Sequence, residues 1–442
     1  MIDNVRVTVC EGTKLHPDVP DNAKKRQTAD LKNPRPINIV LDGVNKNNMN
    51  DQFVLTEKLL SQHLLLAGGI GSGKTNTFNL IMSNIIPQLS SKDVMIIFDT
   101  KGDFYKEFYK PGDIVISNDN TAMGINGVDY WNIINELEDD DRLEENVTEV
   151  STALFAEKLK KSGDNSFFPN AAKDLVTAIL YHFVKVKNKI KSDNKIISEC
   201  FKSLDHEWLL DLLSMYPQFE AMKSYIPKSA PEQAVGVLAE IQQVTRSLFI
   251  GNFTKSGTLS IRNLVKNKGG RKVFVEYDIG IGSTLKPIYT LLFDLAIKEA
   301  LCRKKSDGNV FFVVDEFKLL PNLQHIDDAV NFGRSLGIKF MIGIQNIDQI
   351  IEAYNENMAM NIMSGFLNLF AFKVNDYSTR EYIKKRLGTN RKSTVFKTLS
   401  IHETIDNANV VEDWDIASLV LGQAVVYLNN SEPFVFRFKE YK

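Results

Sequence analysis

One segment of the chain has the residue types and spacing needed to hold a phosphate group. Residues 68–75 read GGIGSGKT and match the pattern G-x-x-x-x-G-K-[ST] in full. Glycines let the backbone wrap an anion and point its N–H groups inward, because they have no Cβ atom. Lys74 is expected to reach the β- and γ-phosphates of ATP, and Thr75 to bind Mg²⁺ through its hydroxyl. The predicted nucleotide-binding residues are Gly68, Gly69, Ile70, Gly71, Ser72, Gly73, Lys74, Thr75 and Asn76.

The elements around this segment are those that the motif requires. The apolar run at residues 62–67 predicts a buried strand before it, and a helix is predicted from about residue 74 to residue 88. The start of that helix adds the positive end of its dipole to the phosphate site. The alternative is a glycine-rich turn that matches by chance, which the flanking strand and helix disfavour.

An acidic pair at the end of another apolar strand is the second part of the predicted site. Residues 309–314 form this strand, and Asp315 and Glu316 follow it. Asp315 is expected to hold Mg²⁺ through water, and Glu316 to act as general base on the attacking water. Asp99 also ends an apolar strand and is a rival metal ligand. The alternative for Asp99 and Lys101 is a turn closed by its own hydrogen bonds.

The composition excludes several classes of protein. The chain has 442 residues, of which 43% are hydrophobic and 24% charged, so two or three globular domains are expected. Because the net charge is −2, any nucleic-acid surface must be local. No apolar run approaches the roughly twenty residues of a membrane helix, and the N-terminus lacks a signal-peptide pattern. The six histidines are dispersed and no zinc site is predicted; reduced thiols are expected at Cys10, Cys200 and Cys302.

Apolar strands alternate with helices along the chain, which predicts an α/β fold with a mainly parallel sheet. Strands are predicted at residues 37–43, 62–67, 93–99, 272–277, 309–315, 339–344, 368–374 and 422–428, and a helix at residues 286–303. Helical periodicity replaces the apolar runs from about residue 134, as at residues 170–186 and 231–248. We therefore expect an all-α domain at residues 134–255, inserted between the two parts of a nucleotide-binding domain at residues 1–133 and 256–442.

The motif set resembles the type IV coupling proteins of conjugation and secretion, the TraG/TraD family within the HerA–FtsK group of motor ATPases. The similar segments are residues 63–75, 97–105, 311–317, 333–346 and 375–383. Asp103 stands where the family has Glu in its Asp-x-Lys-Gly-Glu element. The resemblance spans about residues 60 to 390 and places the helical insertion where the family has its all-α domain. The implied fold is a RecA-like P-loop NTPase domain with this insertion.

The resemblance implies roles for two further residues. Gln345, at the end of a strand, would sense the γ-phosphate, because an amide both donates and accepts hydrogen bonds. Arg334 would act as an arginine finger on the ATP of a neighbouring subunit. The alternatives are a polar strand end for Gln345 and a surface charge for Arg334. A finger acting in trans requires a ring, and the family works as homohexamers.

The function implied is an ATPase that moves DNA, together with a relaxase, into a type IV secretion or conjugation machine. Family members usually begin with membrane-spanning helices, and this sequence has none. A cytoplasmic location is expected, or a peripheral one at the inner face of the cell membrane with a separate membrane partner. The alternatives are a HerA- or FtsK-like motor in repair, segregation or phage defence, and an ATP-binding substrate receptor that does not hydrolyse ATP.

Charged and aromatic clusters offer weaker indications. Lysines at 158, 160, 161, 185, 187, 189, 191 and 195 and the clusters at residues 266–272 and 384–386 suit sequence-independent phosphate contacts, but solvated helix faces are their alternative. Tyr377 and Tyr382 are candidates for base stacking or for packing. The acidic run at residues 136–145 is expected to be a linker or an exposed helix start, with a docking surface for a basic partner as the alternative.

Overall fold

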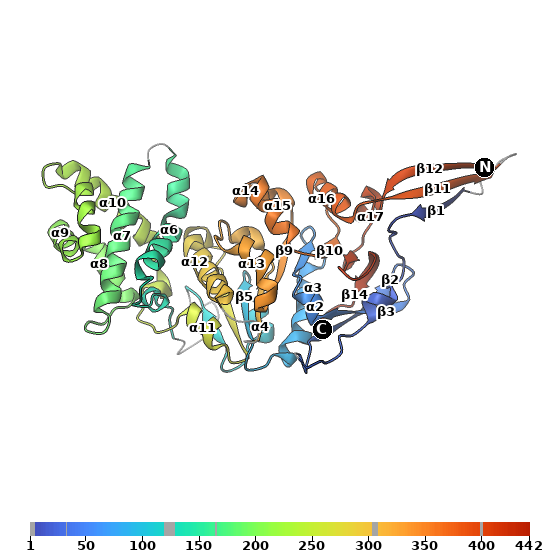
Figure 1. The fold of residues 1–442 in the computed structure, drawn as a ribbon, viewed down its shortest axis with the longest axis horizontal. Coiled ribbons are helices and arrows are strands. Elements are labelled where there is room, and N and C mark those ends of the chain that lie inside the picture. The colour runs from blue at the N-terminus through green and yellow to red at the C-terminus, as the bar shows by residue number, and fades with distance from the viewer. Residues whose placement is uncertain (1–4, 32, 119–128, 164–165, 303–307, 398–400) are drawn as a thin grey trace. The chain divides into compact units, whose positions relative to one another are not determined.

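The computed structural model describes residues 5–31, 33–118, 129–163, 166–302, 308–397 and 401–442 (Figure 1). The chain forms two compact units. Unit 1 comprises Met1–Met95, Lys304–Pro321 and Asp327–Lys442, and unit 2 comprises Ile96–Arg303 and Asn322–Ile326.

The strands of unit 1 that surround the phosphate motif form a parallel sheet with an antiparallel extension. Their order is β3-β2-β14-β13-β10-β4-β9-β8. The neighbours β10, β4, β9 and β8 are parallel, and the pairs from β10 out to β3 are antiparallel. The bounds are β2 Asn38–Asn45, β3 Asn50–Thr56, β4 Leu64–Ala67, β8 Val310–Val314, β9 Ile338–Ile344, β10 Asn368–Phe372, β13 Gln423–Tyr427 and β14 Phe434–Phe438.

The sequence explains why the parallel strands lie at the centre. Every residue of β4, β8, β9 and β10 is buried. Nearly continuous apolar strands are typical of a sheet covered on both faces, and these four confirm the predicted α/β fold. In register, Leu64 of β4 lies opposite Met341 of β9 on one side and Asn368 of β10 on the other.

Helices and a second small sheet complete unit 1. The helices are α1 Asp21–Lys24, α2 Glu57–Leu60, α3 Lys74–Ile85 with η1 Ile86–Gln88, η6 Phe317–Leu319, α13 Ile326–Phe332, η7 Gly333–Leu336, α14 Ile347–Tyr354, α15 Glu356–Ser364, α16 Tyr377–Leu387 and α17 Asp413–Ala417. A three-stranded antiparallel sheet pairs β1 (Val5–Glu11) with β11 (Thr389–Lys397), and β11 with β12 (Ile401–Asn409). This sheet was not predicted from the sequence.

The described residues of unit 2 combine strands with helices of up to 20 residues. β5 (Val94–Asp99), of which Val94 and Met95 belong to unit 1, precedes β6 (Ile114–Ile116) and β7 (Arg271–Glu276), which pair in parallel. The helices are α4 Asp103–Phe108, η2 Ile133–Glu136, α6 Leu143–Ser162, α7 Phe167–Val186, α8 Asn194–Lys202, α9 His206–Met215, η3 Pro217–Tyr225, α10 Pro231–Leu248, η4 Gly251–Thr254, α11 Ile261–Asn267 and α12 Gly282–Leu301. The predicted end of α12 at Arg303 lies outside the described residues.

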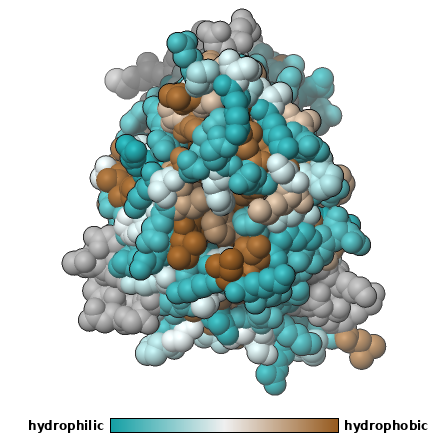
Figure 2. Space-filling view, turned by 90° about the vertical axis from the view of Figure 1, so that its left-hand side faces the viewer, coloured by the Kyte–Doolittle hydropathy of each residue, from teal (hydrophilic) through white to brown (hydrophobic). Residues whose placement is uncertain are grey.

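The described residues from α6 to α10 form helices joined by turns and loops, with no strand among them, as the periodicity predicts (Figure 1). The helix predicted at residues 231–248 matches α10 at both ends. Figure 2 shows this end of unit 2, where hydrophilic side chains predominate and apolar ones gather in small patches. Among the described residues of the whole chain, no helix has both the length and the apolar composition needed to cross a bilayer.

Glu136 joins the chain segments that enter and leave this helical run. Its carboxylate accepts hydrogen bonds from Trp131 Nε1 at 2.6 Å, Ser260 Oγ at 2.9 Å, Ile261 N at 2.6 Å and Arg262 N at 3.1 Å. The prediction that the acidic run is exposed is therefore wrong for Glu136, which is 1% exposed, because α11 needs an acceptor for its first N–H groups. The prediction holds for Glu144 and Glu145, which lie in the exposed first turn of α6.

Candidate nucleotide-binding site

The phosphate motif forms the turn between β4 and α3, as predicted. Gly73 precedes α3 with φ 110° and Gly71 has φ 69°, conformations that favour glycine. A Cβ atom on Gly73 would lie 2.9 Å from the Cα atom of Gly422, so a side chain is also excluded by space. The sequence thus produces a turn that only glycine can build, at the N-terminus of a twelve-residue helix.

The polar groups of the motif are arranged to receive an anion. Lys74 is buried, and its Nζ donates to the carbonyl oxygens of Gly68 at 2.5 Å and Gly69 at 3.1 Å. The Ser72 hydroxyl is buried without a hydrogen-bond partner among the described residues. A buried hydroxyl without a partner costs free energy, which a phosphate oxygen would recover. The donor set of this turn therefore fits a nucleotide phosphate.

The acidic pair lies at the same edge of the sheet as the motif. β9 separates β8 from β4, so their carboxyl ends are two strands apart, roughly 10 Å. Thr75 Oγ1 donates a hydrogen bond of 2.6 Å to Asp315 Oδ2. Gly343 of β9 permits this arrangement, because a Cβ atom there would lie 2.3 Å from the carbonyl oxygen of Asp315. The hydroxyl and the carboxylate are hard oxygen donors of the kind that Mg²⁺ prefers.

Glu316 is held beside the end of β9. Gln345 Nε2 donates a hydrogen bond of 2.6 Å to Glu316 Oε2, and Lys318 Nζ lies 3.5 Å from Oε1. The structure thus brings together Glu316 and Gln345 at the strand ends beside the motif. An amide that holds a carboxylate is suited to move when a γ-phosphate competes for its N–H group.

Arg334 lies elsewhere in unit 1. It is an exposed residue of η7, before the first residue of β9, whereas Gln345 follows the last. The seven residues of β9 span roughly 23 Å, so Arg334 is far from the nucleotide turn of its own chain. Two further predicted nucleotide-binding residues differ in their surroundings. Ile70 is 88% exposed. Asn76 forms hydrogen bonds with the C-terminal segment: its Nδ2 donates to Lys439 O at 3.0 Å, and its Oδ1 accepts from Tyr441 N at 2.8 Å.

Asp99 lies in a turn closed by hydrogen bonds to its own carboxylate, which was the alternative to a metal-binding role. Its carboxylate accepts hydrogen bonds from Tyr105 N at 2.7 Å and Lys101 N at 3.3 Å. Burial raises the pKa of Asp99, and the backbone N–H groups act in the opposite direction. The carboxylate thus ties the end of β5 to the start of α4.

The role of His63 was not predicted from the sequence, in which this residue is part of an apolar run. His63 is 1% exposed and has φ 58°, in the left-handed region that few residues other than glycine adopt. Its Nδ1 accepts a hydrogen bond of 3.0 Å from Phe340 N of β9, and its carbonyl accepts one of 2.9 Å from Asn368 Nδ2 of β10. Burial lowers the pKa of His63 to about 3, with a further lowering from Lys339. A neutral histidine therefore joins three strands at the end of the sheet opposite the nucleotide turn.

Some lysines of these clusters form ion pairs. Pairs with N–O distances between 2.5 and 3.5 Å are Lys158–Glu240, Lys185–Asp139, Lys191–Asp193, Lys266–Glu138, Lys272–Asp113 and Lys384–Asp413. Tyr377 is 66% exposed, and the Tyr382 hydroxyl accepts a hydrogen bond from Arg386. Because neighbouring carboxylates partly neutralise these lysines, no DNA-contact residue is assigned.

The central parallel sheet and the turn after β4 define a P-loop NTPase of the RecA-like class. Residues 53–440 match the family model described as the type IV secretion-system coupling protein DNA-binding domain, and the chain belongs to this family.

Known proteins similar to this chain agree with that family. The type IV secretion system-coupling protein VirD4 of Bartonella henselae is 21% identical over 352 residues, which cover 74% of this chain and 53% of VirD4. The chain thus spans about half the length of this relative. The unbound bacterial conjugative coupling protein TrwBdeltaN70 is similar in structure, with a TM-score of 0.73, 18% identity and 88% coverage of both chains. TrwB in complex with ADP and Mg²⁺ has a TM-score of 0.67, 17% identity and 87% coverage of both chains. These structures share the fold of this chain.

Proposed function

We propose that this chain hydrolyses ATP with Mg²⁺ and is a motor that couples DNA to a type IV secretion or conjugation machine. The observation that carries the proposal is the hydrogen bond between Thr75 and Asp315, which joins the phosphate turn to the acidic pair. The nucleotide and Mg²⁺ in the similar TrwB structure support the same interpretation. Thr75 and Asp315 would hold Mg²⁺, which would neutralise charge on the phosphates.

The side chains divide the remaining work of hydrolysis. Lys74 leaves its two carbonyl partners and binds the β- and γ-phosphate oxygens. Glu316 accepts a proton from the attacking water, and Gln345 orients Glu316 through their 2.6 Å hydrogen bond until the γ-phosphate attracts its amide. Catalysis depends on positioning and on charge neutralisation, because phosphoryl transfer requires no covalent step on the protein.

The place of Arg334 supports an arrangement of subunits in a ring. An exposed arginine at the far end of β9 can act on ATP only if that ATP belongs to another subunit. We propose a homohexamer in which Arg334 of each chain stabilises the transition state of its neighbour. We also propose the division into residues 1–133, 134–255 and 256–442, which the helices from α6 to α10 support, with the all-α part available for cargo.

DNA, a relaxase and channel proteins of the secretion system are the proposed partners. Family membership over residues 53–440 supports the DNA partner, and the similarity to VirD4 supports the secretion system. We propose a location at the inner face of the cell membrane, through a separate membrane partner or a further segment.

An ATPase assay with several DNA forms tests the proposal. Single-stranded and double-stranded DNA are added to the purified chain at low and high salt, with Lys74→Ala as the inactive control. We expect stimulation by at least one form, weaker at high salt. ATP binding without hydrolysis under any condition would favour a substrate receptor, and the absence of DNA stimulation would contradict a DNA motor.

A further inference from the structure

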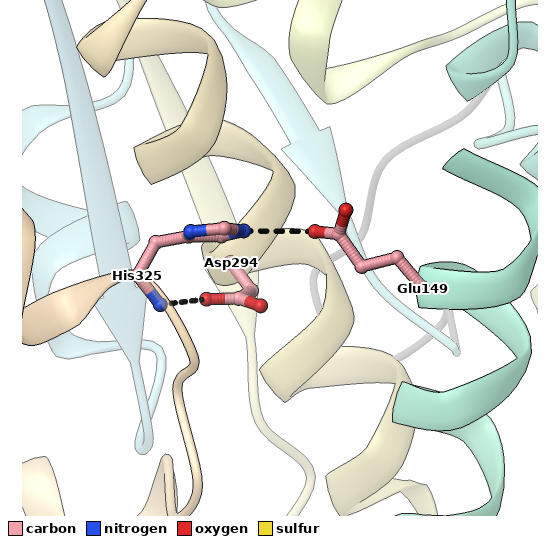
Figure 3. A group of neighbouring side chains, drawn as sticks. All are labelled: Glu149, Asp294 and His325. Carbon is pink, nitrogen blue, oxygen red and sulfur yellow. Dashed lines mark hydrogen bonds and ion pairs between the residues drawn. The ribbon is translucent and has the colours of Figure 1, made fainter. Parts of the chain in front are cut away.

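A polar cluster in unit 2 joins α6, α12 and the segment Asn322–Ile326. Figure 3 shows the ring of His325 facing the carboxylate of Glu149 on α6, and its backbone N–H facing the carboxylate of Asp294 on α12. His325 Nε2 lies 2.9 Å from Glu149 Oε1, and the backbone N–H of His325 donates a 3.0 Å hydrogen bond to Asp294 Oδ1. Asp294 is 3% exposed, so this contact is shielded from water. A single residue of the segment is therefore fixed to two helices at once.

The charges of this cluster balance without a bound cation. Lys298 of α12 contacts the second oxygen of Glu149 and also donates a 3.0 Å hydrogen bond to Asn146. Two carboxylates therefore face one ammonium group and one imidazole. The three ligand atoms lie close enough to hold a metal ion, but the ammonium group already occupies Glu149. When His325 is protonated, its positive charge and that of Lys298 face the two carboxylates, and the charges cancel. The cluster is therefore better suited to bind a proton than a metal ion.

The position of this cluster along the chain connects it with the acidic pair. His325 follows Glu316 by nine residues. Within unit 1, the first part of this connection is held by Tyr354, whose hydroxyl donates a 2.6 Å hydrogen bond to Leu320 O and whose ring stacks on Phe317. Within unit 2, the last part is held by His325. The segment between Leu320 and His325 is short. A displacement of His325 is therefore passed along few rotatable backbone bonds before it reaches the part of the chain that follows Glu316.

We propose that His325 is a positioning residue, and that its contact with Glu149 regulates the nucleotide site by holding the segment after the acidic pair to α6 and α12. This inference rests on the proposed ATPase function. When α6 shifts on binding of cargo to the all-α region, the contact transmits the shift to residues 316–321. Coupling of this kind changes activity by about five-fold or more.

The contact depends on pH in a defined direction. The hydrogen bond with Glu149 raises the pKa of His325 against the lowering by burial, and Asp294 raises it further. The pKa of His325 in the folded state lies above its ordinary value of 6.5. The stabilisation of the folded state by protonated His325 is therefore complete below pH 6.5 and is lost as pH rises through the folded-state pKa. Hydrogen bonds from His325 and Lys298 lower the pKa of Glu149 despite its burial, and burial raises that of Asp294 to about 6. As pH rises above 6.5, His325 loses its charge at its raised pKa, whereas Glu149 stays ionised and Asp294 titrates at about 6.

The test compares DNA-stimulated and basal ATPase activity between pH 6.5 and 9. The variants are His325→Gln, Glu149→Gln, the double variant and His325→Arg, which keeps a positive charge. Glu207→Gln is the matched control, because Glu207 forms an exposed ion pair with Lys228 on the same helical region. Amide hydrogen exchange of residues 316–326 is measured in parallel, since it reports the contact without requiring activity.

The expected results separate positioning from general stability. DNA stimulation of the wild type falls several-fold as pH rises. His325→Gln and Glu149→Gln retain basal ATPase activity but have low DNA stimulation at every pH. The double variant has the same stimulation as either single variant. His325→Arg restores stimulation and removes its pH dependence. If the wild type hydrolyses ATP and the variants keep its pH profile, this inference is wrong. If the wild type hydrolyses no ATP, the proposed function fails instead. Independently of activity, unchanged amide hydrogen exchange of residues 316–326 in Glu149→Gln would refute the role of the contact.

Discussion

The Thr75 hydroxyl donates a 2.6 Å hydrogen bond to the Asp315 carboxylate across a separation of 240 residues in the chain. The two residues follow strands that have β9 between them, and Gly343 of β9 leaves room for the backbone of Asp315. An acidic strand end and a phosphate turn are each common alone. Their direct contact brings both into one candidate site, in which the Thr75 hydroxyl and the Asp315 carboxylate are the oxygen donors that would hold Mg²⁺.

Loss of either member of this contact should reduce Mg²⁺-dependent nucleotide binding. We expect Thr75→Val and Asp315→Asn to weaken binding of a fluorescent ATP analogue by about 10- to 100-fold in Mg²⁺ and little in EDTA. Thr75→Ser keeps the hydroxyl and should bind within a few-fold of wild type. Equal loss with and without Mg²⁺ would mean that Thr75 holds the loop rather than the metal.

Replacement of Glu316 should separate binding from hydrolysis. Glu316→Gln keeps the size of the side chain but cannot accept a proton, so ATPase activity should fall by about 10²- to 10⁴-fold. The affinity for ATP should change little, because Lys74 and the turn are untouched. Glu352→Gln on the exposed face of α14 is the control and should keep wild-type turnover. Steady-state turnover and equilibrium binding are measured on the same preparations, and substantial hydrolysis by Glu316→Gln would exclude it as the base.

The sequence predicts where the candidate-site residues lie in the fold wherever a motif and its flanking elements agree. The apolar runs of β4, β8 and β9 predict buried parallel strands, and parallel strands place Lys74, Glu316 and Gln345 at one edge of a sheet. The same reasoning fails for β11 and β12, whose polar residues lack the alternation of a half-buried strand. These strands form because β1 and β11 supply backbone partners, which no local pattern predicts.

The buried polar clusters were unpredictable for a related reason. Glu136 is 124 residues from Ser260, and Glu149 is 176 residues from His325. An acidic residue in an acidic run has the local signature of a solvent-exposed group whether or not a distant helix requires it. His63 likewise has no sequence signal, since its role depends on a left-handed backbone and on partners in β9 and β10.

Arg334 should act in trans. We expect Arg334→Ala to lower ATPase activity by about 10³-fold or more without loss of ATP binding. Lys74→Ala is inactive for a different reason, so mixing the two variants should restore part of the activity through sites that combine an intact Lys74 with a neighbour's Arg334. The exposed Arg437 of β14 provides the control, and Arg437→Ala should retain activity alone. The absence of any recovery over a range of mixing ratios would argue against a shared site.

Glu136 should be a major determinant of the stability of unit 2. Its carboxylate accepts four hydrogen bonds in a buried position, and Glu136→Gln would place an NH₂ group against donors of Trp131, Ser260 and α11. We expect a loss of about 3 kcal/mol in the free energy of unfolding, measured by urea titration with helical circular dichroism. Glu138→Gln is the matched control, because Glu138 is exposed and pairs with exposed Lys266, and its loss should stay within about 0.5 kcal/mol. Equal effects of the two substitutions would show that the chain segments around α11 are held by apolar packing and not by the Glu136 carboxylate.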